Sequence, residues 1–237
     1  MSPRLNRHTV FLGGAIETAI WAVVLVWLLD AWYPKYYADL FSIGVKCAGF
    51  LGVLFVLGAV LGALFYKPDE KAYANDLSVM FVVRLAVLAF GLHLTYSQRP
   101  LLVVFSVDRF VVVQAHQISL NQAPPAIVKM IVNAEEPPVI AARKLPNDDI
   151  SAILSVMGGA PDIEYQPGQY EKLGFQQESF YERMCSKDIL GSRNGPGNLE
   201  RCGSLAVPLV YKDDNHATAI FDTNELRIAR IDYKDPW

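Results

Sequence analysis

Four residues stand out in this sequence because their side chains could form specific bonds: Glu17, Arg84, Cys185 and Cys202. Glu17 and Arg84 each lie inside a long apolar run, where an ionisable group is costly unless it faces a partner. The two cysteines are the only ones in residues 98–237, and paired thiols in an oxidising compartment usually join. The chemistry expected here is an ion pair between apolar segments and one structural disulfide.

The apolar runs that carry the charged residues are long enough to be transmembrane helices. They cover residues 10–32, 42–66 and 77–97, and each has 21 to 25 residues with few charges. At about 1.5 Å per residue, each helix would cross a hydrocarbon core of about 30 Å. Three buried helices of a soluble protein are the alternative, but three such runs in succession favour a transmembrane domain over residues 1–97.

The first run could also be the core of a cleaved signal peptide, since it follows Arg4 and Arg7. It is longer than a typical signal core, and no small-x-small cleavage site precedes the next element. The chain then passes through Trp32, Tyr33 and Pro34, and such aromatic residues suit a membrane–water interface. These features favour an uncleaved helix.

Basic residues between the runs predict the orientation, because loops rich in lysine and arginine stay in the cytoplasm. Arg4 and Arg7 precede the first run, and Lys67 and Lys71 lie in the second loop. The N-terminus is therefore expected in the cytoplasm. Three crossings then place residues 98–237 on the outer side.

This orientation brings Glu17 and Arg84 to matching depths. Each lies seven or eight residues from the cytoplasmic end of its helix, roughly 10–12 Å at helical rise. Opposite charges at equal depth predict an ion pair. The pair could simply hold two helices together, or one or both residues could engage another membrane helix.

Residues 98–237 are expected to form a soluble domain, because 14 of the 21 basic and 18 of the 24 acidic residues fall there. β-Branched, aromatic and alternating segments predict strands at residues 101–113, 205–211, 217–221 and 226–231. Capping and turn residues predict short helices at 150–157 and 170–184. Together these segments predict a small α+β domain with an antiparallel sheet.

The cysteine pair has two interpretations. Cys185 and Cys202 flank a glycine-rich loop, and closing a loop of this size with a disulfide would stabilise the fold by roughly 3 kcal/mol. A thiol oxidoreductase is the alternative, although the spacing is not C-x-x-C. Cys47, in the second apolar run, is expected to be a packing residue.

The sequence contains no motif of the common catalytic or cofactor-binding kinds, such as H-E-x-x-H, G-x-S-x-G, a Walker loop or a dinucleotide fingerprint. The four histidines are dispersed, and no metal or cofactor is expected. The mildly acidic outer domain makes nucleic acid an unlikely partner. A non-enzymatic protein is therefore predicted, with a membrane-anchored sensor that binds a small ligand as an alternative.

Short motifs along nearly the whole chain resemble those of type IV pilin accessory proteins of the TfpX/TfpZ kind. They are Trp32-Tyr33-Pro34, Phe65-Tyr66-Lys67-Pro68, Asn75-Asp76-Leu77, Arg99-Pro100, Phe105-Ser-Val-Asp108-Arg109-Phe110, Val207-Pro208-Leu209 and Asp235-Pro236-Trp237. The sequence departs from that family in the second run, where Gly58-Ala59 replaces an expected Gly-Pro and Leu54 replaces an acidic residue.

The resemblance implies a multi-pass protein of the bacterial inner membrane whose outer domain is periplasmic. It implies a helper for one cognate type IV major pilin, acting on pilin stability, pilus assembly or dynamics, with the assembly machinery as a further partner. Such a helper would contact both the membrane helix and the globular head of the pilin. Pilins of this type carry a lone glutamate near the start of their helix, and Arg84 is expected to pair with it.

Overall fold

The computed structural model describes residues 6–66, 72–106, 109–143, 159, 161–173, 204–211, 215–223 and 225–233. The chain divides into two compact units, Met1–Ser97 and Gln98–Trp237, which we call the helical unit and the sheet domain. The division falls where the third apolar run ends and charged residues become frequent.

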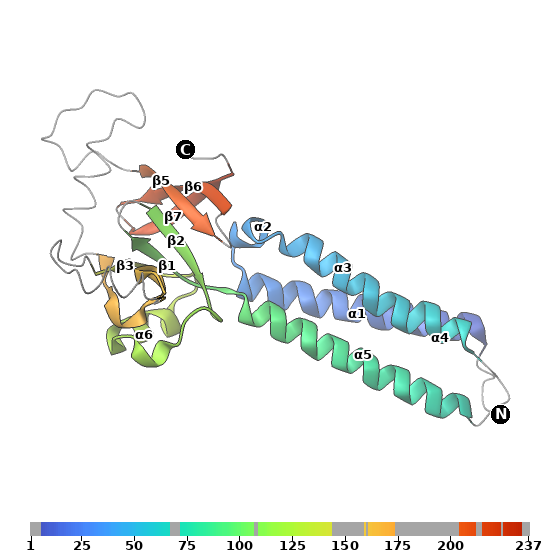
Figure 1. The fold of residues 1–237 in the computed structure, drawn as a ribbon. Coiled ribbons are helices and arrows are strands. Elements are labelled where there is room, and N and C mark those ends of the chain that lie inside the picture. The colour runs from blue at the N-terminus through green and yellow to red at the C-terminus, as the bar shows by residue number, and fades with distance from the viewer. Residues whose placement is uncertain are drawn as a thin grey trace, which may run out of the picture. The chain divides into compact units, whose positions relative to one another are not determined.

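Three helices that are long and apolar enough to cross a membrane make up the helical unit, as the sequence predicts (Figure 1). The elements in chain order are α1 (Arg7–Trp32), the short α2 (Tyr37–Leu40), α3 (Ile43–Phe55), the π-helix η1 (Val56–Val60), α4 (Leu61–Leu64) and α5 (Ala72–Ser97). The elements α3, η1 and α4 follow one another without a break and together form the second long helix. Asn6 caps the start of α1 by accepting a hydrogen bond from the Thr9 amide at 2.8 Å.

The second long helix is the centre of the helical unit. α1 packs along α3, η1 and α4, and α5 packs against α3 and η1. The C-terminal ends of α1 and α5 are also tied directly, because the Tyr33 hydroxyl donates to the Thr95 carbonyl at 2.8 Å. Beside this bond, the rings of Trp32 and Tyr96 meet edge to face with centroids 5.1 Å apart. Tyr33 is buried, at 1% exposure, because its hydroxyl finds a backbone partner on the neighbouring helix.

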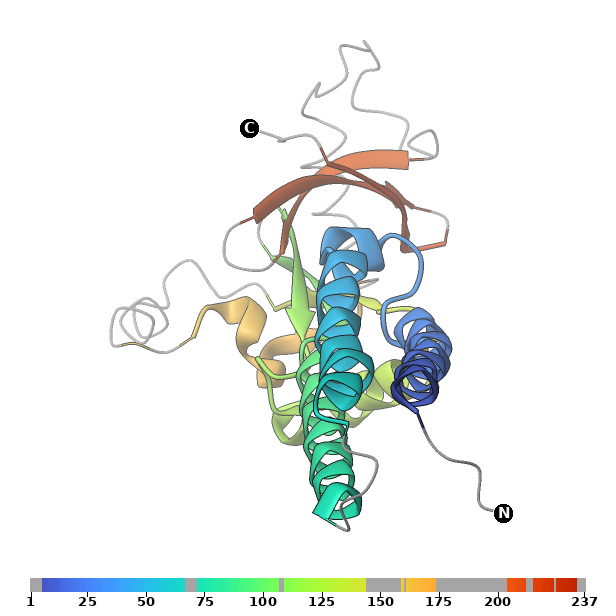
Figure 2. The same ribbon diagram turned by 90° about the vertical axis from the view of Figure 1, so that its right-hand side faces the viewer.

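The sheet domain contains one seven-stranded sheet in the order β4-β3-β1-β2-β5-β6-β7. Its strands are β1 (Pro100–Ser106), β2 (Arg109–Gln114), β3 (Val139–Ala142), β4 (Tyr170–Glu171), β5 (Ser204–Tyr211), β6 (Asn215–Asp222) and β7 (Arg227–Asp232). Figure 2 shows the C-terminal strands, orange to red, as strongly curved ribbons. The last three strands are close to the three predicted at the end of the sequence.

The prediction of an antiparallel sheet is wrong, because the sheet is mixed. β1–β2, β3–β4, β5–β6 and β6–β7 pair antiparallel, whereas β1–β3 and β2–β5 pair parallel. β2 returns the chain to the edge of the sheet where β1 begins, so β3, reached through the helix α6 (Pro125–Asn133), starts at the same edge as β1 and runs parallel to it. The alternation of side chains gives the faces of a strand but not the direction of its partner.

Two further sequence predictions differ from the structure. The single strand expected over residues 101–113 is a hairpin, in which Phe105 pairs with Phe110. Tyr170 and Glu171, expected to start a helix, form β4, and residues 174–184 lie outside the described residues, as does the predicted helix at 150–157.

The core on one face of the sheet is built by alternation along the hairpin. Leu102 and Val104 of β1 and Val111 and Val113 of β2 point to the same side, where Ile127 of α6 covers them. All five are at most 2% exposed. Ile127, Met130 and Ile131 of α6 face this core, so the helix covers one face of the central strands.

Candidate functional site

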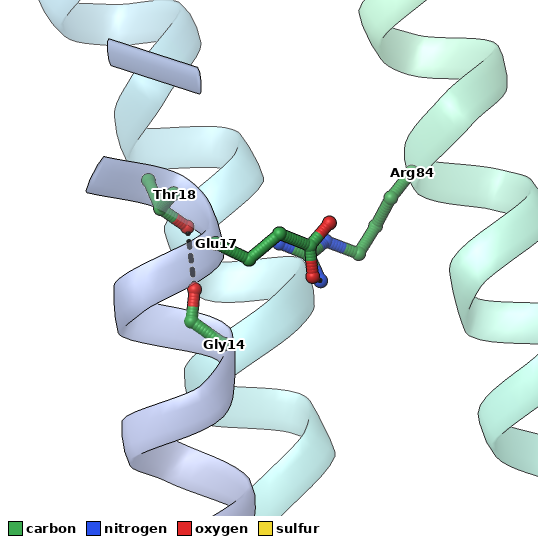
Figure 3. Close-up of polar contacts among 4 residues, drawn as sticks. All are labelled: Gly14, Glu17, Thr18 and Arg84. Atoms are coloured by element: carbon green, nitrogen blue, oxygen red, sulfur yellow. Dashed lines mark hydrogen bonds and ion pairs between the residues drawn. The ribbon is translucent and has the colours of Figure 1, made fainter. Parts of the chain in front are cut away.

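The structure joins Glu17 of α1 to Arg84 of α5. Arg84 Nη1 lies 2.5 Å from Glu17 Oε2, so the two charges form a direct ion pair between residues 67 positions apart. Figure 3 shows the Arg84 side chain reaching from its helix toward Glu17. The Arg84 side chain is 10% exposed and that of Glu17 is 34% exposed. Of the two interpretations that the sequence left open, the link between two helices is therefore present in the structure.

Gly58 makes room for the guanidinium. A Cβ atom at Gly58 would collide with Cζ and both terminal nitrogens of Arg84, so no other residue fits there without moving the arginine. Gly58 belongs to η1. Gly58 and Ala59 also stand where the resemblance described above leads to an expected Gly-Pro. The arginine thus rests on the backbone of the second helix.

The π-helix η1 widens the second helix at this level. The Leu61 amide donates to the Val56 carbonyl, five residues back rather than four. Single π-helical turns inside α-helices occur frequently at functional sites. Both Gly58 and Ala59, the small residues of this turn, are buried, Gly58 beneath the arginine and Ala59 against α1.

The first helix, α1, packs directly against the same turn, η1. A Cβ at Gly14 would lie 2.7 Å from Cα and N of Ala59, which means that the two backbones are in contact. Thr18 is buried one turn later, and its hydroxyl donates to the Gly14 carbonyl at 2.8 Å (Figure 3). Small residues that permit such approach are typical of helix pairs in membranes.

Arg84 is incompletely paired. Its Nε and Nη2 atoms are buried and have no hydrogen-bond partner in the described part of the chain. Leaving a buried donor unpaired costs about 1–3 kcal/mol, and more for a charged group. Nε–H and Nη2–H point the same way from one edge of the guanidinium plane, which is the edge that binds a carboxylate or phosphate with two parallel hydrogen bonds.

A cavity of about 540 Å³ adjoins the ion pair. Val10, Gly13 and Glu17 of α1, Leu57 of η1, and Phe81 and Arg84 of α5 are among its lining residues. The lining is mostly apolar, and it belongs to the N-terminal halves of α1 and α5. Those halves are joined through Glu17 and Arg84, whereas the C-terminal ends are held by the Tyr33 hydrogen bond to Thr95 and by the ring contact of Trp32 with Tyr96.

A second buried charge lies in the sheet domain and was not anticipated from the sequence. Glu164 is 6% exposed, accepts a hydrogen bond from the Ser106 hydroxyl at 3.3 Å, and lies 3.8 Å from Arg109 Nη2. No sequence signal marks Glu164, because the partners of its side chain, Ser106 and Arg109, are 55 or more positions away in the chain.

Tyr170 completes this contact network. Its hydroxyl donates to the Glu164 backbone carbonyl at 2.6 Å. Burial, followed by the nearby negative charge of Glu164 and by Tyr165, raises the pKa of Tyr170 well above its ordinary value. The cluster links the segment around Glu164 to the β1–β2 hairpin, which is a structural role.

The cysteines and metal ligands give no further site. Cys185 and Cys202 lie outside the described residues, so their disulfide stays a prediction, and Cys47 is a free thiol. Among the residues that the structure describes, no cluster of three histidine, cysteine, aspartate or glutamate side chains could hold a metal ion.

The fold and this site define a class: a protein with three helices of membrane-spanning length, an arginine paired between two of them, and a mixed-sheet domain. In comparisons with known proteins, no family model, curated protein or solved structure matches the chain.

Proposed function

We propose that this protein is a non-enzymatic accessory protein of the bacterial inner membrane that binds one cognate type IV major pilin. The resemblance of its short motifs to the TfpX/TfpZ kind supports the assignment. In the proposed orientation the N-terminus is cytoplasmic and the sheet domain is periplasmic, where it meets the globular head of the pilin. The lipid bilayer surrounds the three helices.

One observation supports this function above the others: Arg84 is a buried cation in a helix of membrane-spanning length, and two of its nitrogens lack a partner in the described part of the chain. Such a group inside a bilayer is a functional-site hypothesis by default. A pilin waiting in the membrane offers an apolar helix with one carboxylate near its start. Binding of that carboxylate by Arg84 would give both the arginine and the pilin carboxylate a charged partner inside the membrane.

The test is co-purification of the cognate pilin with the full-length protein from membranes in mild detergent. Arg84→Leu removes the charge, and pilin recovery should fall at least tenfold. Lys46→Leu is the matched control, because it also removes one cation from a membrane-length helix but does not line the cavity. Unchanged recovery with a folded, inserted Arg84→Leu protein would remove the arginine from the mechanism.

A further inference from the structure

The cavity between α1 and α5 is open space bounded by three helices, with a charged residue at one end. Its apolar lining would meet lipid or protein in a membrane, because water is excluded there. Val10 and Phe81 supply apolar wall on opposite helices, and Leu57 lies on the helix between them. The Nε and Nη2 atoms of Arg84 have no hydrogen-bond partner in the described part of the chain, and an anion with two acceptor oxygens would pair with both.

We propose that this cavity is the binding site for one face of a partner's membrane helix, and that a carboxylate of this helix draws the buried Nε–Nη2 edge of Arg84 toward the cavity and binds it. The inference rests on the proposed function for the identity of the partner, and adds to it the contact surface. The cavity of 540 Å³ suits a few large side chains from one helix face, such as leucine and phenylalanine, rather than an entire helix. The partner helix therefore lies along the opening between α1 and α5.

The depth of Arg84 in the membrane favours a protein helix over a lipid as the occupant of the cavity. Arg84 follows Asp76, the first residue of the third span, by eight positions, which is about 12 Å along the helix axis. The phosphate of a lipid stays at the headgroup level, so it would have to descend this distance to reach Arg84. An acyl chain would fill the space but leave the two N–H groups unpaired. A side-chain carboxylate on a membrane helix meets both requirements.

Glu17 acts in this site as a positioning residue. It occupies only Nη1 of Arg84, and that single bond holds the guanidinium against Gly58, with Nε and Nη2 buried and not used by Glu17. Glu17→Gln keeps an acceptor oxygen at this place and removes one negative charge near the incoming carboxylate. Pilin recovery should therefore remain within about twofold of wild type or rise. Glu17→Leu removes the acceptor, releases the arginine and should lower recovery at least fivefold.

Two glycines provide a matched pair for testing the cavity itself. Gly13 lines the cavity, and Gly52 does not; a Cβ at either glycine meets no atom within 4 Å. The first side-chain carbon of a leucine at either position therefore meets no atom of the protein. Gly13→Leu projects into the proposed binding site, so it should reduce pilin recovery at least tenfold. Gly52→Leu should leave recovery unchanged, and thermal stability in detergent checks that both variants remain folded.

Photocrosslinking gives an independent readout in intact membranes. A photoreactive amino acid in place of Phe81, which lines the cavity, should crosslink to the pilin helix, whereas one in place of Phe90, which lies on the same helix but does not line the cavity, should not. A pilin variant whose helix carboxylate is changed to the amide should lose the Phe81 crosslink.

The outcomes separate this inference from the proposed function. If the wild-type protein recovers pilin but Gly13→Leu does so equally well, or if position 81 crosslinks only to lipid, the cavity is not the binding site and the accessory role stands. If the wild-type protein recovers no pilin from membranes, both the accessory role and the cavity assignment are overturned.

Discussion

Gly14 and Ala59 bring the backbones of the first and second membrane-length helices into contact, so closely that a Cβ atom at Gly14 would lie 2.7 Å from Cα of Ala59. The contact lies at the level of the π-helical turn whose Gly58 supports Arg84. The position of the arginine therefore depends on how closely these two helices approach.

Replacing Gly14 should destabilise the helical unit. Gly14→Ala forces the two backbones apart, and overpacking of this kind costs about 1–3 kcal/mol. The neighbouring Gly13→Ala is the control, because its added methyl group meets no atom within 4 Å. Thermal unfolding in detergent would measure the difference, and equal midpoints for the two variants would contradict the close contact.

Arg84→Lys should fold and insert but bind the pilin weakly. Lysine keeps the positive charge beside Glu17, but it lacks the planar edge that gives two parallel hydrogen bonds. Since a hydrogen bond to a charged group contributes about 1.5–3 kcal/mol, pilin recovery should fall roughly tenfold or more. Recovery equal to wild type would show that charge alone matters, and that the Nε–Nη2 edge is not used.

The sheet domain should lose stability at high pH through Tyr170. Burial raises its pKa in the folded state, so above the ordinary tyrosine pKa of about 10 the folded chain holds a proton that the unfolded chain releases. Stability is therefore unaffected by this group below about pH 10 and falls as the pH rises further. Chemical unfolding at about pH 9 and about pH 11 should show a smaller decrease for Tyr170→Phe than for wild type. Identical decreases would exclude this contribution.

The orientation of the chain can be tested in spheroplasts. Protease added from outside should digest residues 98–237 and leave the membrane-length helices protected, because the proposed topology places the sheet domain in the periplasm. A tag at the N-terminus should be cleaved only after lysis. The reverse pattern would place the sheet domain in the cytoplasm, where it could not meet the head of a pilin.

The sequence by itself determined the three helices, because hydropathy is a local property that a single run of residues reveals. It also identified Glu17 and Arg84 as partners, since helical rise converts residue number into depth and both helices start from the same side. The last three strands were predicted from alternation, which is local as well.

Tertiary structure alone decided the rest. Hydropathy does not give the rotation of a helix, so neither the approach of Gly14 to Ala59 nor the place of Gly58 under the guanidinium could be predicted. The parallel pairing of β1 with β3, and the burial of Glu164 beside Ser106, join segments distant in the chain. Such contacts form because burial stabilises distant segments whose surfaces pack well together. The pattern of neighbouring residues along the chain does not show which distant segments these will be.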